Sequence, residues 1–162
     1  MIQMTVGGLG FDPRNLSPLV LLRDQDEINF LPIWIGIFEA ASIAMVLQGV
    51  TAPRPMTHDL LKTVIDKNNS KVNRIIINDI KEGTFFAVIE IEKEGKKLNI
   101  DSRPSDAIAL AIRCQAPIFV AEAVMMQAKL VNAEKDEEET KKFKDFISDL
   151  TPDDFTKYYK KD

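Results

Sequence analysis

The sequence predicts an α+β domain, with a mixed, largely antiparallel sheet, helices on one face of it and a C-terminal helical appendage. Segments of alternating apolar residues, typical of half-buried strands, fill the first third and the middle of the chain. Runs rich in Ala, Leu and Ile, typical of buried helices, lie between and after them. With 162 residues, 45% of them hydrophobic, the chain is long enough to bury one core.

Strands are expected where alternation is bounded by turn residues. A polar run, residues 23–27, is a good hairpin turn between two apolar segments. Pro32 lies in the second of these segments and cannot donate a ladder hydrogen bond, so it marks a sheet edge or a bulge, while Trp34 is expected in the core. Turns at residues 81–82 and 94–95 predict an antiparallel meander. The expected strands are residues 2–9, 19–22, 28–35, 71–80, 83–92, 97–101 and 117–120.

Four helices are expected, each with recognisable end signals. Gly49 suits the residue just past the end of the first helix, and Thr57 suits the N-cap of the second. Pro104 suits the first turn of the third. The first helical run is apolar almost all round, so this helix is expected to be largely buried. The expected helices are residues 39–48, 58–67, 104–115 and 122–131.

The composition changes near the end of the chain. We expect residues 1–131 to form the domain, and residues 132–162 to form a charged linker and an amphipathic C-terminal helix. The tail holds ten acidic and seven basic residues, and therefore three of the four net negative charges. Apolar tail residues and the Pro32 edge favour a homodimer. The tail residues at helical spacing are Phe143, Phe146, Ile147 and Leu150.

The charge balance argues against a broad duplex-binding surface. The net charge is −4 and the pI is about 5.1, whereas generic nucleic-acid binders are basic. The domain without its tail is near neutral, which is compatible with a small basic cleft. No apolar run approaches the ~20 residues that span a bilayer, so we expect a cytoplasmic protein without a membrane partner. Cys114, the one cysteine, is expected to be a small buried hydrophobe.

Two polar clusters at expected helix starts are the candidate sites. Residues 101–106 contain two carboxylates, an arginine and two hydroxyls directly before an apolar helix. Residues 54–59 are built alike and include the only histidine. The sequence has no phosphate loop, dinucleotide glycine fingerprint, zinc-type Cys/His spacing or nucleophile elbow. Carboxylates, arginines and a histidine remain, and they suffice for metal-assisted phosphodiester hydrolysis.

Each polar residue of the clusters has an expected role. Carboxylates are expected to bind a divalent ion, Mg²⁺ or Mn²⁺, and arginines to hold phosphate. The histidine is expected to transfer protons, and no organic cofactor is expected. The expected catalytic residues are His58, Asp59, Asp101 and Asp106; the expected substrate-binding residues are Arg54, Thr57, Arg103 and Ser105; the expected metal ligands are Glu39, Asp101 and Asp106.

Four blocks in this order resemble the signature blocks of the bifunctional nuclease domain family. They are Leu-Pro-Ile-Trp-Ile-Gly at 31–36 followed by Glu39-Ala40, Arg-Pro-Met-Thr-His-Asp-Leu at 54–60, Gly-Thr-Phe at 83–85, and Asp-Ser-Arg-Pro-Ser-Asp-Ala-Ile-Ala-Leu-Ala at 101–111. The resemblance covers roughly residues 1–130. It implies nuclease activity on DNA and RNA, and in plants a role in defence signalling. Our hypothesis for this chain is a metal-assisted nuclease with little sequence specificity.

Two other interpretations of the same clusters stay open. The arginines and helix N-termini also suit a non-enzymatic binding module for an anionic ligand or a protein partner. Alternatively, both clusters are structural and tie helix starts to the sheet through Arg–Asp pairs. A buried Arg103 pair would then make Arg103→Ala cost about 3–5 kcal/mol of stability.

Overall fold

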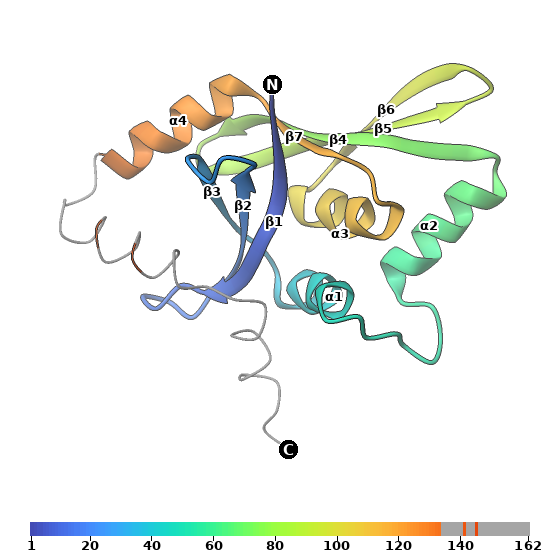
Figure 1. Ribbon diagram of the computed structural model, residues 1–162, viewed down its shortest axis with the longest axis horizontal. Coiled ribbons are helices and arrows are strands. Elements are labelled where there is room, and N and C mark those ends of the chain that lie inside the picture. The colour runs from blue at the N-terminus through green and yellow to red at the C-terminus, as the bar shows by residue number, and fades with distance from the viewer. Residues whose placement is uncertain (134–140, 142–144, 146–162) are drawn as a thin grey trace.

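A single sheet organises the part of the chain that the computed structural model describes, residues 1–133, 141 and 145 (Figure 1). In this part seven strands lie in the order β3-β2-β1-β7-β4-β5-β6. The strands are β1 (Ile2–Phe11), β2 (Pro18–Asp24), β3 (Phe30–Trp34), β4 (Ser70–Lys81), β5 (Thr84–Lys93), β6 (Lys96–Ser102) and β7 (Ile118–Val120). The helices are α1 (Ile37–Leu47), α2 (Thr57–Lys67), α3 (Pro104–Cys114) and α4 (Glu122–Ala133).

Two antiparallel meanders, β1-β2-β3 and β4-β5-β6, are joined through the short strand β7. β7 pairs antiparallel with β1 and parallel with β4, so Ile118 lies between Met4 and Ile75. All three side chains are buried in one core, which explains why a three-residue strand holds the centre of the sheet. The expected mixed, largely antiparallel α+β architecture is confirmed.

The β4–β5 hairpin turns one residue later than expected. Glu82 and Gly83 both have positive φ, at 48° and 78°, as a two-residue turn between twisted strands requires. Glu94 and Gly95 repeat this conformation between β5 and β6, where the turn was expected. Pro32 lies in β3, an edge strand, as expected.

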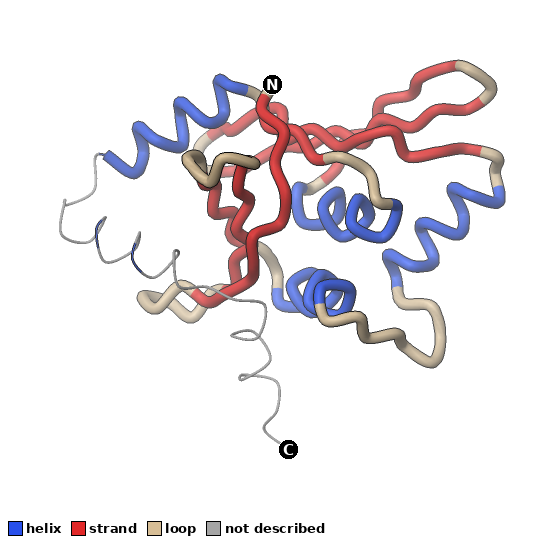
Figure 2. Tube along the Cα trace, viewed as in Figure 1, coloured by secondary structure: helices blue, strands red, loops and turns tan. Residues whose placement is uncertain are grey.

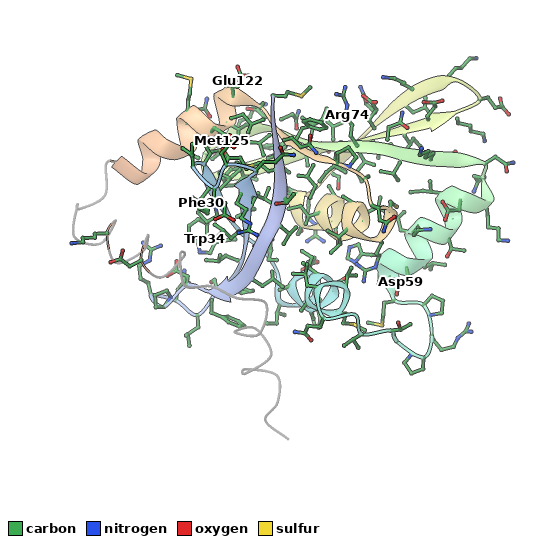
Figure 3. The ribbon with its side chains drawn as sticks, viewed as in Figure 1. Phe30, Trp34, Asp59, Arg74, Glu122 and Met125 are labelled. Atoms are coloured by element: carbon green, nitrogen blue, oxygen red, sulfur yellow. The ribbon has the colours of Figure 1, made fainter. Side chains whose placement is uncertain are left out.

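Three helices share one side of the sheet, and the fourth does not. α1, α2 and α3 lie together, whereas α4 lies across β1 and β2 from them in the view of Figure 1. The expectation of helices on one face is therefore wrong for α4. Buried residues of α4, including Met125, still join the core, and Figure 3 places Met125 close to the strands.

The expectation that the helical run 39–48 is largely buried is confirmed, because each of its residues is buried or half-buried, while Phe38 just before it is 84% exposed. Two further expectations about local structure are wrong. Trp34 is exposed on edge strand β3 beside Phe30 (Figure 3), and its indole N–H donates to Asp12 over 3.0 Å. The N-cap of α2 is Met56, so α2 starts one residue earlier than expected.

The predicted tail falls almost wholly outside the described residues. Of residues 132–162, only 132, 133, 141 and 145 are described, and the first two end α4. None of the helices in the described part of the chain is long and apolar enough to cross a membrane.

Candidate functional site

A network of polar side chains joins the starts of α1 and α3. Arg103 Nη2 donates to Glu39 Oε1 over 2.7 Å, and Arg103 Nε donates to Asp106 Oδ2 over 2.8 Å. The guanidinium thus lies between two carboxylates while 65% of its side chain stays exposed. Hydrogen bonds from Arg103 to Glu39, then to Asp106, raise the pKa of Arg103, so its positive charge is secure.

His58 lies beneath this pair and is buried. Its Nε2 is 2.9 Å from Asp106 Oδ1, and its Nδ1 is 2.7 Å from Ser42 Oγ. Both ring nitrogens therefore have partners, and each oxygen of Asp106 has its own, one in His58 and one in Arg103. Glu39, Ser42, His58, Arg103 and Asp106 are called the polar network below.

Local sequence explains why these side chains converge. Pro104 occupies the first turn of α3, where its missing N–H is no loss, and it fixes Arg103 as the N-cap, three residues before Asp106. Glu39 lies in the first turn of α1, where the positive end of the helix dipole stabilises a carboxylate. Gly36 precedes α1, and a Cβ there would lie 2.1 Å from Glu39 Oε2. The absence of a side chain at Gly36 therefore leaves room for the carboxylate.

A second ion pair, Asp59–Arg113, fastens α2 to α3 next to the polar network. Arg113 Nε donates to Asp59 Oδ1 over 2.7 Å, and its other nitrogens donate to the main-chain oxygens of Ala109 (2.9 Å) and Ser42 (3.1 Å). Arg113 is only 6% exposed. Its hydrogen bond, followed by that from the Met56 N–H, lowers the pKa of Asp59.

A pocket of about 450 Å³ opens beside this ion pair. Its walls come from the C-terminal half of α1, the loop between α1 and α2, the start of α2, and Arg113 from α3. Arg54 lies on the loop and makes no hydrogen bond or ion pair with any residue in the described part of the chain. The lining residues are Met45, Val46, Gly49, Val50, Thr51, Ala52, Pro53, Arg54, Pro55, Asp59, Thr63 and Arg113.

The structure brings together only some of the expected site residues. Glu39, His58, Arg103 and Asp106 share the polar network, and Arg54 and Asp59 line the pocket. Thr57 is exposed at the first residue of α2, and Ser105 is buried in the first turn of α3. Among the described residues, neither donates a side-chain hydrogen bond to the network.

Asp101 lies apart from the other expected metal ligands. Its neighbour Ile100 pairs with Ile89, whose side chain is buried in the core beneath α3. Successive strand residues point to opposite faces, so Asp101 points away from α3, where Asp106 lies. It is exposed on edge strand β6.

The expected carboxylate cage for a divalent ion is therefore not assembled. Glu39 and Asp106 meet the guanidinium of Arg103 instead, and Asp101 faces the other way. Within residues 1–133, 141 and 145, no three His, Cys, Asp or Glu side chains are grouped so that they could hold a metal ion. In these positions the residues do not fit a bound Mg²⁺ or Mn²⁺, because such an ion needs several oxygen ligands directed at one position.

Sequence analysis missed two residues of this region, Ser42 and Arg113. Both lie inside apolar helical runs, and both are buried. Arg113 follows Asp106 by seven residues, which places both on one side of α3, and Ser42 follows Glu39 by three. Such spacing from a candidate site residue could have revealed them.

The fold and its site define the class of the protein: an α+β domain with a polar network at the helix starts of a mixed sheet. The chain belongs to the bifunctional nuclease domain family, because the family described as "Bifunctional nuclease domain" matches residues 20–133. The resemblance seen in the sequence blocks is confirmed.

Relatives of two kinds match. An uncharacterised protein of Mycobacterium tuberculosis strain H37Rv is 40% identical over 164 residues, which cover 96% of this chain and 98% of that protein. "Bifunctional nuclease 2" of Oryza sativa subsp. japonica is 31% identical over 108 residues, covering 64% of this chain and 33% of that protein. "Bifunctional nuclease 2" of Arabidopsis thaliana is 29% identical over 107 residues, covering 64% and 32%. The chain thus matches about a third of each plant protein.

Proposed function

We propose that this chain hydrolyses phosphodiester bonds of DNA, RNA or both, with little sequence specificity, at the polar network. The observation that carries the proposal is the exposed, charged Arg103 held between two carboxylates over the buried His58. Family membership and the names of the plant relatives support it.

The arrangement supplies the groups that hydrolysis needs. Arg103 can bind a phosphate through two parallel N–H donors, which are then withdrawn from Glu39 and Asp106. A carboxylate so released can take a proton from the attacking water as the water oxygen bonds to phosphorus. Arg103 stabilises the charge that grows on the phosphoryl oxygens, and the departing sugar oxygen takes its proton from solvent.

His58 has a positioning role in this scheme. Because its ring is buried and both nitrogens are hydrogen-bonded, it holds Asp106 at the correct angle without reaching the substrate. This geometry favours orientation over the proton transfer that the sequence suggested for His58. No step is assigned to a metal ion, because the carboxylates as placed do not form a cage for one.

The test is a cleavage assay on single- and double-stranded DNA and RNA, with and without Mg²⁺ or Mn²⁺. Arg103→Ala and Asp106→Asn are each expected to slow cleavage on the order of 100-fold while remaining folded. Arg23→Ala is the matched control, since Arg23 is also an exposed arginine paired with a carboxylate, Glu27, but lies on β2.

The outcomes separate the candidate functions. Loss of cutting in both site variants, but not in the control, supports the nuclease and its site. Equal cutting by all variants refutes the site assignment. Absence of cutting by identically purified wild type refutes the nuclease and favours the binding module.

A further inference from the structure

The pocket beside the Asp59–Arg113 pair has the size and position of a ligand site. Its volume of about 450 Å³ falls within the ~300–1,000 Å³ range of small-molecule sites. The loop that walls it, drawn in tan between α1 and α2, extends from both helices in Figure 2. Figure 3 labels Asp59 near the start of α2, and Asp59 is one of the residues that line the pocket.

The charges of the pocket favour an anion. Arg113 and Asp59 neutralise each other, and Arg113 is held further by two main-chain oxygens. Arg54 adds a positive charge that no carboxylate in the described part of the chain balances. An incoming phosphate would therefore find one cation whose hydrogen-bond donors are available, without having to break an existing pair.

The remaining walls favour an apolar, flat group. Met45 and Val46 from α1 and Val50, Pro53 and Pro55 from the loop line this part of the pocket, together with the hydroxyl side chains of Thr51 and Thr63. Thioether sulfur makes favourable contacts with aromatic rings, and aliphatic side chains bury a ring face without requiring hydrogen bonds. A ligand that combines a phosphate with a planar ring satisfies both parts of the pocket.

The pocket also lies next to the polar network, and hydrogen bonds of Ser42 join the two. Ser42 accepts from Arg113 with its main-chain oxygen and meets His58 with its hydroxyl. His58 and Asp59 are consecutive, and one belongs to the network while the other lines the pocket. A nucleic-acid strand with one phosphate bound at the polar network can therefore place the next nucleotide in the pocket.

We propose that the pocket binds one nucleotide unit of a single-stranded substrate, with its phosphate on Arg54 and its base against Met45 and Val46. The choice of a nucleotide rests on the proposed nuclease function. A base that enters a pocket must leave its stack, which is easiest in a single strand, so the pocket would make the enzyme prefer single-stranded substrate.

The test measures calorimetric binding of AMP, with inorganic phosphate as a second probe. AMP is expected to bind more tightly than phosphate, and Arg54→Ala to weaken AMP on the order of 10- to 100-fold, the effect of one lost charged hydrogen-bonding group. Val50→Trp, on the exposed part of the loop, is expected to fill the pocket and weaken AMP without changing thermal unfolding followed by circular dichroism. Arg23→Ala is the control.

The results distinguish this proposal from the nuclease proposal. AMP binding that Arg54→Ala and Val50→Trp both weaken supports the pocket even if the wild type cuts nothing, in which case only the nuclease fails. No AMP binding by a wild type that cuts normally overturns the pocket. Equal affinity for AMP and phosphate, or AMP binding unchanged in both variants, also overturns it.

Discussion

Truncation of Arg113 is expected to destabilise the fold far more than truncation of Arg103, because Arg113 is buried and Arg103 is not. Arg113 is 6% exposed and donates to Asp59 and to the main-chain oxygens of Ala109 and Ser42. Arg103 is 65% exposed, and its carboxylate partners can be hydrated when it is removed. The structural interpretation of the sequence was stated for Arg103; we expect a structural role instead for Arg113, which joins α2 to α3.

The expected magnitudes differ several-fold. Removing one partner of a buried ion pair costs about 3–5 kcal/mol. Asp59 is partly exposed and can be rehydrated, so Arg113→Ala is placed at about 3 kcal/mol, which lowers the melting temperature by about 10 °C in a domain of this size. Arg103→Ala is expected to cost less than about 1 kcal/mol, as exposed pairs do.

The assay is urea unfolding followed by the fluorescence of Trp34, the only tryptophan, beside far-ultraviolet circular dichroism. Arg113→Met keeps most of the apolar stem, so its difference from Arg113→Ala isolates the packing contribution. An Arg103→Ala variant as unstable as Arg113→Ala would refute the reasoning and show that Arg103 is structural. An Arg113→Ala variant of wild-type stability would refute it as well.

Three other predictions follow from the same contacts. In Gly36→Ala the new methyl group would displace the Glu39 carboxylate, so cleavage should fall while stability changes by less than about 1 kcal/mol; unchanged cleavage would exclude Glu39 from the reaction. Hydrogen bonds from Arg14 lower the pKa of the buried Asp12 in the folded protein. The contribution of Asp12 to the free energy of unfolding is therefore complete above the pKa of ~3.9 in the unfolded chain, and it is lost as the pH falls through the lower pKa in the folded protein. Asp12→Asn should thus cost about 2 kcal/mol at pH 7 and progressively less below pH 4 in urea titrations, and a gap equally large at pH 3 would contradict this. The expected homodimer rests partly on the Pro32 edge, and Phe38, which follows that edge strand by four residues and is 84% exposed, adds apolar surface next to it in sequence; Phe38→Glu should therefore shift sedimentation from dimer toward monomer, and a monomeric wild type at micromolar concentration would exclude the dimer.

Much of the sheet was predictable because strand alternation and turns are local signals. The β4-β5-β6 meander follows from alternation and two glycine-containing turns, and only the β4–β5 turn was misplaced, by one residue. The central position of β7 was not predictable, because three apolar residues carry no register information. The exposure of Trp34 was missed because a large apolar residue is usually buried, whereas here the indole N–H has its partner at the sheet edge.

The candidate site was predictable in composition but not in geometry. The clusters at residues 54–59 and 101–106 do meet, because α2 and α3 pack side by side. Which side chains of the two clusters contact each other depends on which face of each helix or strand packs against its neighbour. Asp101 is the last residue but one of β6, and Asp106 lies in the first turn of α3; the alternation of β6 turns Asp101 away from the face that α3 covers.

The hydrogen-bonded residues Ser42, His58 and Asp106 have the residue types of a nucleophilic triad, but the serine is the buried member here and the aspartate is the most exposed one. In such a triad the serine oxygen meets the substrate and the aspartate is buried behind the histidine. Here the aspartate side chain is 29% exposed, His58 is 9% exposed, and Ser42 is buried within α1. Asp106 Oδ1 lies 2.9 Å from His58 Nε2, and the Ser42 hydroxyl lies 2.7 Å from His58 Nδ1, so the ring is held at both nitrogens. The hydroxyl thus anchors the ring from inside, and the end of this hydrogen-bonded series that substrate can reach is Asp106 with Arg103.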